Sequence, residues 1–221
     1  MAIVLKNGYV FLHIPKTGGE WFTTCLNRAN LTVGEVGEKH CDIQGLGKYR
    51  TRQTPTKRVI EFYRRLYLSD SPITFTLIRN PIDWYCSYWS FRNDNKWEFH
   101  GKIGSIKKYH PWNELSLFDG MEFNDFVDHV TKKQPGIYTH LVNSYLFNSG
   151  CIPIRLENLV TDMETVLRQS DYSKLYEVLS EIPASNKSSS SKQLKESMTE
   201  KVKQKIAFSD QFFISKYYNT N

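Results

Sequence analysis

One short segment near the amino terminus limits the folds open to this chain more than any other. The apolar run Tyr9–Ile14 has the β-branched and aromatic residues of a buried strand, and it leads directly into the turn Pro15–Gly19, of sequence P-K-T-G-G. Apolar residues then recur with helical spacing from Phe22 to Ala29. Because backbone N–H groups and a helix N-terminus converge in such a turn, the pattern predicts an anion-binding site.

The residues around this turn limit the protein classes to which it can belong. Asn7-Gly8 is a turn signal that separates the run from Ile3–Leu5, which predicts a hairpin. A Walker P-loop has its lysine after the second glycine, whereas Lys16 precedes both glycines, and the chain has no G-x-G-x-x-G. An ATPase or a Rossmann dehydrogenase is therefore disfavoured. The turn by itself leaves open an ordinary strand-to-helix connection with an exposed lysine.

A second segment repeats the arrangement. The strand-like run Ile73–Ile78 ends at Arg79, and helical spacing begins after Asn80 and Pro81. Asparagine is a good N-cap and proline suits the first helical position. Ser87 follows Arg79 by eight residues, so a guanidinium and a hydroxyl can meet a second anion, and the arginine fork matches phosphate oxygens.

With both segments in view, the chain resembles the sulfotransferases that use 3'-phosphoadenosine 5'-phosphosulfate (PAPS). Pro15–Gly19 is similar to their 5'-phosphosulfate loop, in the form of the carbohydrate-modifying branch, and Trp21 is similar to the tryptophan of the cytosolic branch. Arg79 through Ser87 is similar to their 3'-phosphate motif. The resemblance implies a three-layer α/β fold with a central, mainly parallel sheet flanked by helices, a P-loop-NTPase-like architecture.

The resemblance also implies individual roles. Lys16 would stabilise the charge that develops on the leaving oxygen, and His40 would be the catalytic base, although a surface loop histidine or a helix cap is an equal interpretation of that residue. Lys187 and Ser188 would close over the cofactor, or belong to a serine-rich linker. The expected cofactor-binding residues are Lys16, Thr17, Gly18, Gly19, Trp21, Arg79, Ser87, Lys187 and Ser188.

Glu20 departs from the family, which has threonine or serine at that position. A carboxylate in the first helical turn would compete with a phosphate, although it suits the helix dipole. Either Thr17, Thr23 or Thr24 supplies the missing hydroxyl, or Glu20 points outward.

The rest of the chain is expected to form a single domain over residues 1–221. Residues 152–159 resemble the family's late strand and its E-x-L segment, and a helix should follow. Amphipathic spacing predicts further helices near 55–68, 122–132 and 194–206. The irregular segment 93–120 is the candidate acceptor-binding segment, and 184–192 is a candidate mobile loop.

Composition restricts the partners. The net charge is +6, with basic residues gathered between positions 48 and 65, which fits an anionic partner or a solvated helix face. The four cysteines lack C-x-x-C spacing, Cys25 and Cys86 have the positions of core residues, and no acidic cluster has metal-ligand spacing. No signal peptide or membrane span is visible, which favours a cytoplasmic protein.

These observations predict an enzyme that transfers the sulfuryl group of PAPS to a hydroxyl or amine of a carbohydrate or small polar acceptor, releasing adenosine 3',5'-bisphosphate, without a metal. No nucleic acid is expected as a partner. The alternatives are a non-catalytic module that binds polyanions or nucleotides on the same scaffold, and a small-molecule kinase. The sequence does not identify the acceptor.

Overall fold

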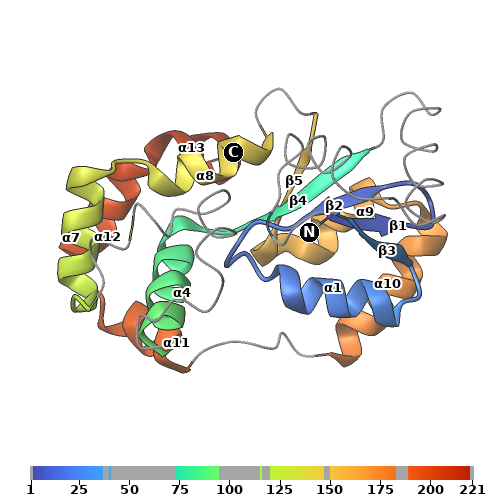
Figure 1. The fold of residues 1–221 in the computed structure, drawn as a ribbon, viewed down its shortest axis with the longest axis horizontal. Helices are drawn as coiled ribbons and strands as arrows, with labels where there is room; N and C mark the ends of the chain where they lie inside the picture. Colours follow the sequence, from blue (N-terminus) through green and yellow to red (C-terminus); the bar gives the residue numbers. More distant parts are fainter. Residues whose placement is uncertain are drawn as a thin grey trace. The chain divides into compact units, whose positions relative to one another are not determined.

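The computed structural model describes residues 2–36, 40, 73–94, 115, 120–146, 150–182 and 189–219. The chain divides into two compact units, each with its own interior (Figure 1). The sheet unit comprises Met1–Ile78 and Ser144–Asn186, and the helical unit comprises Arg79–Asn143 and Lys187–Asn221. The basic cluster, the helix expected near 55–68 and almost all of segment 93–120 lie outside the described residues.

A five-stranded sheet in the order β3-β1-β2-β4-β5 forms the centre of the sheet unit (Figure 1). The pairs β2–β4 and β4–β5 are parallel, whereas β1 is antiparallel to both β2 and β3, so β1 alone runs against the other four strands. The α/β fold class is confirmed, and the sheet is mixed because the chain begins with a hairpin. The strands are β1 (Ala2–Leu5), β2 (Val10–Leu12), β3 (Thr32–Val36), β4 (Thr74–Ile78) and β5 (Ile152–Arg155).

The predicted hairpin is confirmed. Ile3 lies opposite Phe11, and Gly8 occupies the left-handed region with a φ of 87°, which glycine adopts without steric cost. The side-chain oxygen of Asn7 accepts a hydrogen bond from the Tyr9 N–H at 3.0 Å. This turn sets the direction in which β2 enters the sheet, and therefore where the segment after it emerges.

Three helices pack on one face of the sheet: α1 (Gly19–Arg28), α9 (Leu159–Val166) and α10 (Gln169–Glu181). Residues on the other face, such as Val4 and Leu12, are also buried, as both faces of a three-layer α/β sheet require. The core on the helical face includes Ile3, Leu5, Phe11, Phe75, Leu77 and Ile154 from the strands and Phe22, Cys25, Leu26, Leu159, Met163 and Leu175 from the helices.

The late strand is also confirmed, and an ion pair holds its end. The Arg155 guanidinium donates two hydrogen bonds to Asp162 in α9, at 3.0 and 2.8 Å, and the Arg155 N–H donates a third at 2.9 Å. Burial opposes ionisation, but these bonds and the positive charge hold the pKa of the Asp162 carboxyl below its ordinary value. The short helix η2 (Leu156–Asn158) is thereby fixed between β5 and α9.

The helical unit is built around aromatic rings on α4. The Trp84 ring stacks on Tyr88 and on Tyr138, with centroids 5.2 and 4.8 Å apart, and Phe213 meets Tyr138 edge-on. The helices are α4 (Pro81–Asp94), α7 (Phe123–Lys133), α8 (Ile137–Leu146, whose last residues belong to the sheet unit), α11 (Ser189–Ser197), α12 (Glu200–Ser209) and α13 (Gln211–Tyr217).

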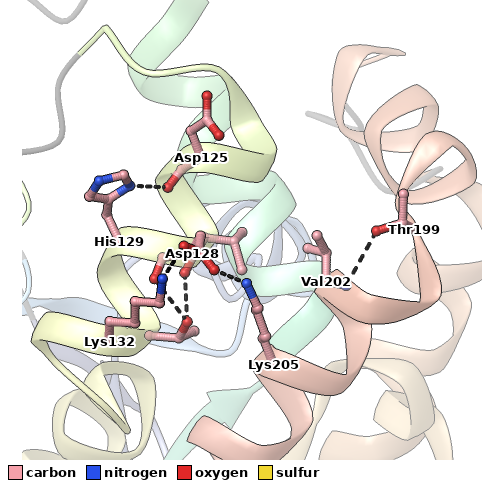
Figure 2. A network of polar contacts seen from close by, with 9 residues as sticks. Asp125, Asp128, His129, Lys132, Thr199, Val202 and Lys205 are labelled. Carbon is pink, nitrogen blue, oxygen red and sulfur yellow. Dashed lines mark hydrogen bonds and ion pairs between the residues drawn. The ribbon is translucent and has the colours of Figure 1, made fainter.

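The helix expected over 194–206 is in fact two helices, α11 and α12. Their apolar residues keep helical spacing across the break, but Thr199 begins a new helix because its hydroxyl caps the Val202 N–H (Figure 2). Figure 2 also shows Lys205 of α12 paired with Asp128 of α7. The expected loop 184–192 is helical from Ser189 onward, and its earlier part lies outside the described residues.

The start of α1 has room only for glycine. A Cβ atom built on Gly19 would lie 2.2 Å from Cδ2 and 2.4 Å from Nε2 of His13, distances that real Cβ atoms do not show. The His13 side chain is only 3% exposed and packs beside the Phe11 ring, so it cannot simply turn into solvent. The contact between His13 and Gly19 therefore fixes how closely α1 approaches the end of β2.

We expect Gly19→Ala to lower the free energy of unfolding by about 1–3 kcal/mol, because overpacking outweighs the better helix propensity of alanine. Urea unfolding measures this change. Gly34→Ala is the matched control, since a Cβ there meets nothing within 4 Å, and it should change stability by less than about 0.5 kcal/mol. Equal stability of the Gly19→Ala variant and the parent protein would contradict the assigned packing.

Candidate functional site

The turn after β2 has a strained backbone. Lys16 and Gly18 both lie in the left-handed region, with φ values of 65° and 85°. This conformation is uncommon for lysine, and strain of about 1–3 kcal/mol is retained mainly at binding and catalytic sites. Two left-handed residues so close together bend the chain sharply, and a bend of this kind can gather backbone N–H groups that suit an anion.

The helix that follows begins within the turn itself. Gly18 is the N-cap of α1 and provides no side-chain cap, and the first helical hydrogen bond runs from the Phe22 N–H to the Gly18 carbonyl at 3.0 Å. The N–H groups of Gly19 and Trp21 precede this bond, so they belong to the set that a helix N-terminus presents to an anion.

The hydroxyls near the turn donate to backbone carbonyls. Thr17 is fully buried and donates to the Ile14 carbonyl at 2.8 Å, which closes the turn. Thr23 and Thr24 donate to carbonyls four residues earlier in α1. Glu20 is exposed. The outward-pointing alternative for Glu20 therefore agrees with the structure, and the hydroxyl proton of Thr17 is already used within the turn.

Side chains also pack behind Gly18. A Cβ at this position would lie 3.0 Å from Cδ1 of Leu156, the first residue of η2. The two glycines of the turn are thus enclosed by Leu156 and His13. Their small size serves this packing, in addition to the close anion approach expected from the sequence.

His40 lies beside the turn, although 24 residues separate it from Lys16 in the sequence. Its Nδ1 is 3.1 Å from the His13 carbonyl oxygen, and the two imidazole centroids are 4.6 Å apart. The Tyr145 hydroxyl donates to the His40 carbonyl at 2.5 Å, and His40 has a left-handed φ of 66°. Tyr145 therefore holds the backbone of this histidine, and His13 holds its ring.

The contact with His13 also selects a tautomer of His40. A carbonyl oxygen has no proton to give, so Nδ1 must be the donor in this hydrogen bond. In the neutral ring the lone pair then lies on Nε2, which is the nitrogen able to accept a proton. This is the ring orientation that a general base at this position would need.

Three other residues were predicted to bind the cofactor from this unit or the segment after it, namely Trp21, Lys187 and Ser188. The indole N–H of Trp21 donates to the Ile182 carbonyl at 3.4 Å, so its polar group is used within the sheet unit. Ile182 is the last described residue before the segment that holds Lys187 and Ser188, and both of these lie outside the described residues.

The second predicted segment forms the start of α4 in the helical unit. The Asn80 side chain accepts a hydrogen bond from the Ile82 N–H at 3.0 Å, which confirms the predicted cap. The backbone of Arg79 is held by Tyr138, whose hydroxyl accepts from the Arg79 N–H and donates to the Arg79 carbonyl, both at 2.8 Å.

Charged groups gather around the first turns of α4. Lys195 of α11 pairs with Asp83 at 2.7 Å, and Ser87 lies one turn beyond Asp83, half-buried. Burial and Asp83 raise the pKa of the Cys86 thiol to about 12, while the positive charges of Arg79 and Lys195 oppose that rise. Two cations and one carboxylate are therefore close to the same stretch of helix.

Sequence reasoning missed Tyr138, Tyr145 and Lys195. The first two act through hydroxyl contacts with residues 59 and 105 positions away, and no local pattern marks such contacts.

Among the described residues, no group of three or more histidine, cysteine or acidic side chains is arranged to hold a metal ion. Of the helices that the structure describes, none is long and apolar enough to cross a membrane.

Comparison with known proteins identifies the family of the chain. No curated protein and no solved structure matches the chain. A family model described as "Sulfotransferase family" matches residues 2–220, which include both units, the turn after β2 and the start of α4. The chain belongs to the sulfotransferase family.

Proposed function

We propose that this protein transfers the sulfuryl group of PAPS to a hydroxyl or amine of a carbohydrate or another small polar acceptor. Family membership supports sulfuryl transfer in general. The observation that carries the proposal is the placement of His40 beside the strained turn that holds Lys16, with its Nδ1 occupied by the His13 carbonyl. An anion site and an oriented base at one place are what this reaction needs.

The residues of the turn have the chemistry to hold the 5' end of the cofactor. The backbone N–H groups of Thr17, Gly18, Gly19 and Trp21 would bind the 5'-phosphate, and the Lys16 ammonium would lie at the transferred group. Arg79 and Ser87 would bind the 3'-phosphate, with the guanidinium offering two parallel donors. Lys187 and Ser188 would add cofactor contacts from the segment after α10.

PAPS supplies a sulfuryl group whose S–O bond to the 5'-phosphate breaks as the acceptor oxygen or nitrogen forms its own bond to sulfur. Nε2 of His40 takes the proton that the acceptor loses. Lys16 stabilises the negative charge that remains on the bridging oxygen of the departing adenosine 3',5'-bisphosphate. Positioning and electrostatics carry most of the catalysis in the related chemistry of phosphoryl transfer, and we expect the same here.

The direct experiment is a screen for transfer of radiolabelled sulfate from PAPS to glycans, phenols, amines and small alcohols. The proposal predicts turnover with at least one polar acceptor class. A folded protein that binds polyanions with a strong salt dependence and gives no turnover with any class would instead favour a non-catalytic binding module.

Lys16→Met should reduce kcat/KM for sulfate transfer on the order of 10²- to 10³-fold, because it removes one cation from the leaving oxygen and keeps the length of the side chain. Neither residue is glycine, so the variant keeps the same backbone strain at φ 65°. Lys174→Met, at an exposed lysine of α10, is the control and should leave the rate unchanged. Full activity of Lys16→Met would remove Lys16 from the reaction.

His40→Asn should lower kcat on the order of 10²- to 10⁴-fold with cofactor binding retained. The asparagine amide can still donate to the His13 carbonyl, and asparagine tolerates the left-handed backbone of this position, but it cannot take a proton. Steady-state kinetics at saturating PAPS measures the change, with the exposed His129→Asn as control. A kcat within about threefold of the parent would place the base elsewhere.

A further inference from the structure

The backbone of Arg79 is held by a single hydroxyl group. In extended backbone the N–H and the carbonyl of one residue point to the same side, where a neighbouring strand would normally pair with both. Arg79 comes directly after β4, and the Tyr138 hydroxyl takes both roles, since it accepts from the N–H and donates to the carbonyl at 2.8 Å each. The peptide groups on both sides of the Arg79 Cα are therefore fixed by one side chain.

The position of that hydroxyl is itself fixed. The Tyr138 ring is fully buried, stacks on Trp84 at 4.8 Å and is met edge-on by Phe213 at 4.9 Å. The next residue, Thr139, donates to the buried Asp210 through both its N–H and its hydroxyl, at 2.8 and 2.7 Å. The start of α8 thus cannot shift without breaking contacts to two other elements of the helical unit.

Phosphate binding by an arginine benefits strongly from a backbone that is held in one orientation. Its long side chain loses considerable rotamer entropy on binding, and a guanidinium grips a phosphate through two parallel hydrogen bonds that require a defined approach. The charge of Arg79 already lies close enough to Cys86 to affect the pKa of that thiol, which places the guanidinium near the first turns of α4. The orientation of the Arg79 backbone decides where this side chain starts.

We propose that Tyr138 is a positioning residue for recognition of the 3'-phosphate, acting through the two hydrogen bonds that hold the Arg79 backbone. The inference rests on the proposed function, because it takes Arg79 as the ligand of that phosphate. Tyr138 touches no part of the cofactor in this account. It governs how well the protein distinguishes a nucleotide with a 3'-phosphate from one without it.

The test compares two nucleotides by calorimetric titration: adenosine 3',5'-bisphosphate, and adenosine 5'-monophosphate, which lacks the 3'-phosphate. Tyr138→Phe keeps the stacked ring and removes the hydroxyl. We expect its Kd for the bisphosphate to rise about tenfold, the effect of one or two hydrogen bonds, with the Kd for the monophosphate unchanged. Tyr88→Phe is the matched control, because Tyr88 is also buried and also stacks on Trp84.

A second variant tests the same link without removing the hydroxyl. Phe213→Leu takes away the edge contact that steadies the Tyr138 ring, so it should reduce the preference for the bisphosphate in the same direction by a smaller factor. In an Arg79→Ala background, Tyr138→Phe should have no further effect on this preference, since the group that it positions is gone.

The measured affinities test the proposed function and the role of Tyr138 separately. A parent protein that does not prefer the bisphosphate overturns the proposed function, and the role of Tyr138 with it. A parent protein that prefers the bisphosphate, together with a Tyr138→Phe variant that keeps this preference in full, overturns the positioning role alone. Equal weakening of both nucleotides would assign Tyr138 a general structural role and would also overturn the proposal.

Discussion

The contact between the His13 imidazole and Gly19 is the constraint on which the candidate site depends. It lets α1 start directly after the turn, so that the helix N-terminus lies close to the end of β2. The same histidine carries the carbonyl that orients His40. One buried residue thus contacts both the start of α1, through its ring, and His40, through its carbonyl, and a larger residue at position 19 would push α1 away from that ring.

The two units hold their candidate site residues by similar means. In the sheet unit, the Tyr145 hydroxyl and the His13 carbonyl fix His40, and in the helical unit the Tyr138 hydroxyl fixes Arg79. In each case a backbone carbonyl takes part in the hydrogen bonds. These bonds use neither Nε2 of His40 nor the guanidinium of Arg79. Neutral hydrogen bonds of this kind change the free energy of unfolding only modestly, but they fix the orientation of the groups that they join. Both tyrosines come from α8.

The sequence alone predicted the features that depend on residues close together in the chain. The hairpin follows from Asn7-Gly8, the start of α4 follows from Asn80 and Pro81, and the glycine turn follows from its position between a strand and a helix. It was insufficient where a contact joins distant parts of the chain. Neither α8 nor its two tyrosines stood out, because a buried tyrosine reads as an ordinary core residue. The break at Thr199 was missed since apolar spacing continues across it.

The most direct measurement is a crystal structure of the protein with adenosine 3',5'-bisphosphate bound. We expect the 5'-phosphate within hydrogen-bonding distance of Lys16 and of the first amides of α1, the 3'-phosphate on Arg79 and Ser87, and Nε2 of His40 facing the space beside the 5'-phosphate. A nucleotide bound elsewhere, or bound at the turn through its 3'-phosphate, would contradict the account.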